Sequence, residues 1–175
     1  MQRWLLVPLG LLLLTIVGCG MSSMPAQRPE DFALVYDWRE GSLPPPYHYE
    51  YSITLTAKGN CELIMIPDYP APDVPQWREL FQVPVADRDR LYQQLLDLGL
   101  FTQSWREETN RRVGGSSADL TVVANETKFE IPNQVVESQE DKAEEIYATI
   151  KAIVPPETWA KLEGQLKEYQ DAHQR

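Results

Sequence analysis

The stretch that most limits the fold runs from Tyr49 to Ile66. Residues 49–56, YEYSITLT, alternate apolar and polar side chains, which is typical of a strand buried on one face. The loop Ala57-Lys58-Gly59 separates it from NCELIMI, and a three-residue loop with Gly59 in the left-handed conformation favours a hairpin. The resulting register pairs Leu55 with Cys61, Ile53 with Leu63 and Tyr51 with Met65 on one face. A two-residue turn would instead place Glu62 opposite Leu55, so the longer loop is preferred.

Residues 117–131, SADLTVVANETKFEI, predict a second hairpin. A turn at Asn125-Glu126 pairs Val122 with Phe129 and Leu120 with Ile131, again with the apolar side chains on one face. Each of the two hairpins has one apolar face. Other secondary-structure elements must cover that face.

Helical patterns follow both hairpins. After the Pro-rich segment 67–78 we expect a strand near residues 80–85, and then a helix capped by Asp87 and closed by Gly99. Ser138 and Asp141 stand at capping-box spacing before a second helix, which ends at Pro155-Pro156. Pro156 can begin a third, amphipathic helix, and residues 171–175 are expected to fray.

These patterns predict an α+β fold. Its antiparallel sheet is built from two hairpin–helix halves with the helices packed on one face, plus a C-terminal helix. We assign residues 36–156 to this globular domain and 157–175 to the C-terminal amphipathic helix with its frayed tail.

The N-terminus has the segments of a secretory signal peptide in their usual order. Arg3 supplies a positive end, and an apolar run of about 14 residues from Trp4 to Val17 follows. A membrane-spanning helix needs about 20 residues, so an uncleaved anchor with an incidental cysteine is the weaker alternative. The run closes on Ile16-Val17-Gly18-Cys19. Residues 1–18 are therefore predicted to be a signal, cleaved between Gly18 and Cys19.

Ile16-Val17-Gly18-Cys19 resembles the lipobox of bacterial lipoproteins. The resemblance implies a diacylglyceryl group on the Cys19 sulfur, removal of the signal before Cys19, and acylation, for example with palmitate, of the new amino group. It covers residues 1 to about 20 and names no activity. The chain would be exported and held by acyl chains on the extracytoplasmic face of a membrane, and Gly20 after the cysteine is compatible with an outer membrane. Residues 19–35 then form the lipidated cysteine and a flexible tether.

Charge and metal-ligand content exclude several classes of protein. The formal net charge is −10, which opposes binding to nucleic acid and adsorption to anionic lipid. Two cysteines and two histidines, with no HExxH or CxxC spacing, predict neither a metal site nor a cofactor. The expected membrane contact is therefore through lipid alone.

The chain contains few side chains suited to catalysis, and we assign no catalytic residue. Cys61 falls on the inward face of a strand and is expected to pack in the core rather than react. Along the alternating segment, His48 falls on the same side as the polar residues Glu50 and Ser52. This predicts a solvated histidine. His173 falls in the frayed tail. No nucleophile motif accompanies either histidine.

Three functions remain open from the sequence. The first is a non-enzymatic lipoprotein domain that binds a protein, peptide or small ligand, and Tyr69 and Trp77 on the Pro-rich loop are candidate ligand contacts, with packing of Trp77 beneath the loop as the alternative. The second is an envelope hydrolase that uses carboxylates or His48. The third is an inhibitor of a hydrolase that acts through a protruding loop such as 67–78.

Overall fold

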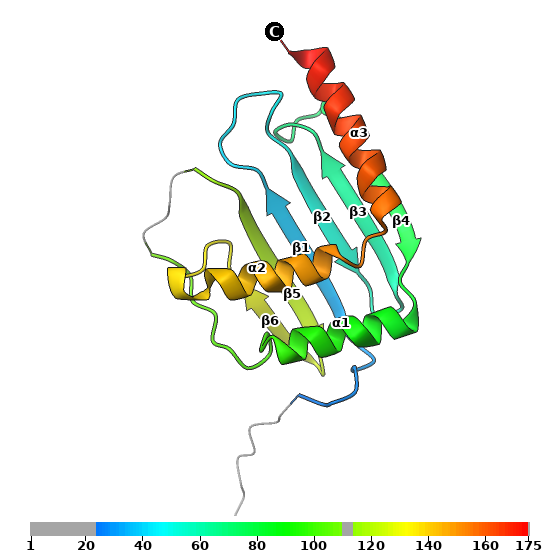
Figure 1. Ribbon diagram of the computed structural model, residues 1–175, viewed down its shortest axis with the longest axis vertical. Helices are drawn as coiled ribbons and strands as arrows, with labels where there is room; N and C mark the ends of the chain where they lie inside the picture. The colour runs from blue at the N-terminus through cyan, green and yellow to red at the C-terminus, as the bar shows by residue number, and fades with distance from the viewer. Residues whose placement is uncertain (1–23, 110–113, 175) are drawn as a thin grey trace, which may run out of the picture.

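A computed structural model describes residues 24–109 and 114–174 of the chain (Figure 1). The described elements, in chain order, are β1 (Ala33–Arg39), β2 (Glu50–Leu55), β3 (Asn60–Ile66), β4 (Trp77–Gln82), α1 (Val85–Asp97), β5 (Ser117–Ala124), β6 (Thr127–Ile131), α2 (Glu137–Lys151) and α3 (Pro156–His173). The strands among them form one six-stranded antiparallel sheet in the order β4-β3-β2-β1-β5-β6. The fold is α+β, as predicted.

β1 joins the two halves of the sheet, and the sequence interpretation missed it. β1 pairs with β2 on one side and with β5 on the other. Phe32, Leu34 and Tyr36 are buried at 2% exposure or less, so the alternation of a half-buried strand is present in this segment. Residues 33–35, which we had placed in the tether, therefore belong to the centre of the sheet.

Both predicted hairpin registers are confirmed. Leu55 pairs with Cys61, Ile53 with Leu63 and Tyr51 with Met65, while Val122 pairs with Phe129 and Leu120 with Ile131. Gly59 has φ +90°, and a Cβ atom there would lie 2.9 Å from the Val83 carbonyl oxygen, so this turn requires glycine. Asn125 and Glu126 have φ values of 52° and 59°, which fits the tight two-residue turn.

The predicted helix starts and the strand after the Pro-rich loop need correction. The strand expected at 80–85 is β4, Trp77–Gln82, and Pro84 turns the chain directly into α1 with φ −57° and ψ 153°. Asp87 lies inside the first turn and binds Arg90 instead of capping the helix. Similarly, Val136 precedes α2, and the N-cap makes no side-chain hydrogen bond, so the proposed capping box does not form.

The predictions for the end of α1 and the start of α3 agree better with the structure. Gly99 follows Leu98, the C-cap of α1, with φ +75°, and Pro156 occupies the first position of α3. The predicted fraying is wrong for residues 171–173, since α3 continues to His173. The His173 ring stacks on Tyr169 with centroids 4.1 Å apart, which holds this last turn.

The segment before β1 is fixed to α1 rather than forming a long tether. Met24 packs against the core, and the Tyr92 hydroxyl donates to the Pro25 carbonyl oxygen at 2.7 Å. Arg28 and Asp89 form an ion pair at 2.7 Å. Of the predicted tether, residues 19–35, the part from Met24 onward therefore contacts the domain.

The helices cover one face of the sheet and leave the other face open (Figure 1). α2 crosses the strands, and its Tyr147 ring lies 5.1 Å from that of Tyr36 on β1. α3 runs beside β3 and β4, where Tyr169 contacts the Trp77 ring edge to face at 6.3 Å. α2 and α3 diverge from the corner at residues 152–155 (Figure 1).

Candidate functional site

Three aromatic side chains stack side by side on the helix-covered face: Trp38 of β1, Tyr51 of β2, and Tyr49 just before β2. Trp38 is the cross-strand partner of Tyr51. The two rings stack with centroids 5.0 Å apart, and the Tyr49 ring lies 4.9 Å from Trp38 on the other side. Cross-strand aromatic pairs stabilise a sheet, and here they also present a wide ring surface between the helices.

The corner between α2 and α3 adds a fourth ring. Trp159, in the first turns of α3, meets Tyr51 edge to face at 5.1 Å. Its indole N–H donates to the Lys151 carbonyl oxygen at 3.3 Å, which satisfies a carbonyl at the end of α2 and links the two helices. The angle between the helices is therefore fixed by a side chain that also lines the space between them.

These elements line an open groove of about 730 Å³, which we call the aromatic groove. Its lining residues come from the sheet and from both helices: Tyr49, Tyr51, Met65, Ala148, Lys151, Ala152, Val154, Pro156, Trp159, Ala160, Glu163 and Leu166. Exposed alanines at 148, 152 and 160 leave the ring surface uncovered, because larger side chains there would fill the angle. Ligand sites commonly have this size and apolar character.

Burial and nearby carboxylates both oppose ionisation of the groove tyrosines. Burial raises the pKa of Tyr51 to about 12. Burial also raises the pKa of Tyr49, and the negative charges of Glu40 and Glu163 raise it further. The phenols are therefore neutral at physiological pH, and carboxylates surround this end of the ring surface.

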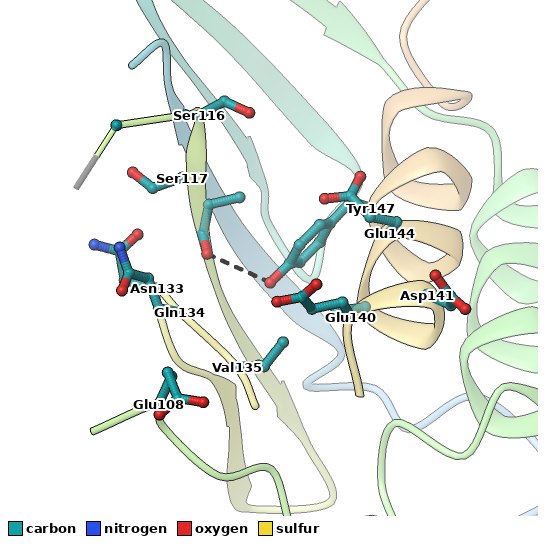
Figure 2. A pocket seen from close by; sticks show the side chains of 14 residues that line it. Glu108, Ser116, Ser117, Asn133, Gln134, Val135, Glu140, Asp141, Glu144 and Tyr147 are labelled. Carbon is teal, nitrogen blue, oxygen red and sulfur yellow. Dashed lines mark hydrogen bonds between the residues drawn. The ribbon is translucent and has the colours of Figure 1, made fainter. Parts of the chain in front are cut away.

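A second pocket, of about 400 Å³, lies at the other end of α2 and is more polar (Figure 2). Carboxylates of α2 lie on one side and Ser117, Asn133 and Gln134 on the other. The Tyr147 hydroxyl donates to the Ala118 carbonyl oxygen at 3.4 Å. Glu108, Gln134 and Glu140 each interact with other groups of the protein.

His48 is buried, which contradicts the predicted solvated histidine. It is 4% exposed, and its ring stacks on Tyr69 with centroids 3.8 Å apart. Nδ1 lies 3.2 Å from the Gly41 carbonyl oxygen and Nε2 lies 3.1 Å from Glu50 Oε1. The alternation of side chains correctly placed His48 on the same side as Glu50. It could not show that the Pro-rich loop folds over this histidine.

The structure separates the two candidate ligand contacts of the Pro-rich loop. Tyr69 lies over His48, and its hydroxyl donates to the Leu43 carbonyl oxygen at 2.9 Å. Trp77 pairs with Met65 in the sheet and packs against α3 on the opposite, helix-covered face. For Trp77 the packing alternative is therefore favoured, although it packs under α3 rather than beneath the loop.

Cys61 lies in the core, as predicted from its strand position. Its residue is 1% exposed, and burial raises the pKa of the thiol to about 12. The reactive thiolate is therefore scarce in the folded protein.

We expect a thiol reagent at pH 8 to label native Cys61 far more slowly than the urea-denatured chain, by about a hundredfold or more. Both burial of the sulfur and the raised pKa act in this direction, and unfolding removes both. The measurement is the rate of dithionitrobenzoate reaction in the two states. Equal rates would show that the β2–β3 face opens readily.

Cys19 lies outside the described residues, so its lipidation stays a prediction. None of the helices within the described ranges combines the length and apolar character that crossing a bilayer requires. Likewise, the described part of the chain holds no cluster of three potential metal ligands among His, Cys, Asp and Glu. Comparison of the sequence with known protein families and with curated proteins finds no match.

The sequence interpretation missed the aromatic groove as a site. It predicts Tyr51 on the apolar face of the first hairpin and an amphipathic helix from Pro156, but it connects neither of them with Trp38. The available signal was the density of rings at alternate positions, Trp38 on one strand and Tyr49 and Tyr51 on the next. Their meeting with α3 depends on the tertiary structure.

Proposed function

We propose that this chain is a membrane-anchored, non-enzymatic binding domain whose ligand site is the aromatic groove. Acyl chains on Cys19 would hold it on the extracytoplasmic face of a bacterial membrane. The observation that carries the proposal is the preformed groove of about 730 Å³, which Tyr49, Tyr51 and Trp159 line together with two linked helices. Rings of this kind offer large contact area at low cost in conformational entropy.

The chemistry of the groove favours binding over catalysis. Its ionisable lining groups in the described structure are Tyr49, Tyr51, Lys151 and Glu163, and no histidine or cysteine is among them. Nucleophilic catalysis needs a nucleophile beside a base and an oriented partner. Outside the groove, both ring nitrogens of His48 face protein oxygens and the side chain is 4% exposed, so a substrate has little access to it. This geometry gives little support to the hydrolase hypothesis.

The inhibitor hypothesis has less support than the groove. Its proposed recognition loop, residues 67–78, is held to the domain through the stacking of Tyr69 on His48 and the bond to Leu43. Tyr69 is 42% exposed, so it is only partly available to a partner. We therefore keep the groove as the site.

A lipid on Cys19 would keep the α1 end of the domain near the bilayer. Cys19 is five Cα–Cα steps from Met24, a reach of at most about 18 Å. Met24 packs at the α1 end, whereas the C-terminal end of α3 lies at the other end of the molecule (Figure 1). This arrangement leaves the groove between α2 and α3 accessible to envelope proteins.

Filling the groove should abolish binding without unfolding the domain. Ala160 is an exposed lining residue on α3, so Ala160→Trp places a bulky side chain in the angle between the helices. Random dodecapeptides displayed on phage would be selected against the full-length protein in phosphatidylcholine nanodiscs. We expect selected peptides to lose affinity by at least about tenfold on Ala160→Trp.

Ala172→Trp is the matched control, because Ala172 is exposed on the same helix but does not line the groove. It should bind the selected peptides like the parent protein. Selection that yields no peptide sensitive to Ala160→Trp would refute the groove as the ligand site.

A further inference from the structure

We infer that the aromatic groove binds a basic peptide segment by receiving a lysine or arginine side chain over its rings. This inference rests on the proposed function and names the class of its ligand. It follows from three properties of the groove: the arrangement of rings, the carboxylates around them, and the charge of the whole chain.

The rings are arranged to receive a cation. Tyr49, Tyr51 and Trp159 line the groove, and Trp159 stands edge-on to Tyr51. Trp38 stacks against the two tyrosines from outside the lining. A cation within about 6 Å of a ring centroid is attracted by the negative face of the ring, and tryptophan is the strongest partner. Neutral tyrosines preserve this attraction.

Carboxylates supply the complementary charge. Glu163 lines the groove, and the negative charges of Glu40 and Glu144 act on the phenols of Tyr49 and Tyr51 from outside its lining. Lys151 and Glu163 are the two charged residues among the lining side chains. A cation bound over the rings therefore meets the negative charge of Glu163 together with those that act on the two tyrosines.

The charge of the whole molecule acts in the same direction. With a net charge of −10 the chain attracts basic segments and repels acidic ones. Aliphatic stems of lysine and arginine can also cover the apolar lining formed by the alanines, Met65 and Leu166. A basic segment thus matches both the charge and the apolar surface of the groove.

The test uses the tightest peptide obtained from the groove selection and a derivative in which each lysine and arginine is replaced by norleucine. Binding to full-length protein in phosphatidylcholine nanodiscs, which carry no net charge, is measured by calorimetry. We expect selected peptides to be enriched in basic residues, and the norleucine derivative to bind at least about fivefold more weakly. Equal affinity of the two peptides would overturn the cationic ligand while leaving the groove as a binding site.

Two variants of α3 separate groove charge from general charge. Glu163→Gln and Glu168→Gln each remove one negative charge, but only Glu163 lines the groove. We expect the basic peptide to lose about fivefold in affinity on Glu163→Gln and less than about twofold on Glu168→Gln. Equal losses on both variants would attribute the binding to net charge and contradict the inference.

A ring variant tests the contribution of the aromatic face. Tyr49→Leu keeps an apolar side chain at a half-buried position but removes its ring. The basic peptide should lose more affinity than the norleucine derivative does. If both peptides weaken equally, the ring serves only as apolar surface and the cation contact is wrong.

Discussion

Replacing Cys19 with Ala is expected to move the protein from the membrane fraction to the soluble extracytoplasmic fraction. The lipobox resemblance places the acyl chains on the Cys19 sulfur and its amino group, and alanine offers no sulfur for the first attachment. Each buried methylene contributes about 0.8 kcal/mol, so two or more acyl chains account for stable attachment. The acidic domain itself has little affinity for anionic lipid.

The measurement is cell fractionation combined with intact mass. The parent protein should lack residues 1–18 and carry acyl mass. Cys61→Ala removes the other cysteine of the chain and should remain lipidated and membrane-bound. An alternative result, in which the parent retains residues 1–18 without acyl mass and Cys19→Ala stays on the membrane, would identify the apolar run as an uncleaved anchor.

The hairpins were predictable because their register depends on the length of a short loop and on the alternation of apolar and polar residues beside it. One face of each hairpin is buried, and only one loop length brings its apolar side chains together, so Leu55 and Cys61 fix the first register. Turn residues agree with this choice, since Gly59 and Asn125 adopt positive φ. Local pattern and tertiary burial coincide at these positions.

β1 and the helix starts show where local patterns mislead. Val35 adds an apolar side chain to the open face of β1, where it is 38% exposed, and this weakens the alternation. At the helix starts, Asp87 and Ser138 have capping chemistry, yet Pro84 and Val136 turn the chain earlier. The direction of the incoming strand or loop decides where a helix begins.

The site could not be predicted from the sequence because its parts are distant in the chain. Trp38, Tyr51 and Trp159 meet only after β1 pairs with β2 and α3 packs over the sheet. The same reason explains His48, whose burial depends on Tyr69 in the loop after the next two strands, β2 and β3. The odd or even position of a residue predicts which face of a strand its side chain occupies. Which segment covers that face depends on the tertiary structure.

Leu162→Ala is expected to give the largest loss of stability among exchanges in α3. Across α3, all of which the structure describes, Leu162 is the one buried residue, at 0% exposure. Removing its buried methyl groups should lower the free energy of unfolding by about 2–4 kcal/mol. Thermal unfolding followed by tryptophan fluorescence should show a decrease in Tm of roughly 5–15 °C for a chain of this size.

The consequence for function follows from the position of α3 as a wall of the groove. When Leu162 no longer holds α3, Trp159 should separate more often from Tyr51, and amide hydrogen exchange in α3 should rise before global unfolding. Leu166→Ala, at a partly buried position, should cost about 1 kcal/mol or less. If Leu162→Ala left both Tm and exchange in α3 unchanged, the ring contacts of Trp159 and Tyr169 would be sufficient to hold the helix, and the groove would depend on them instead.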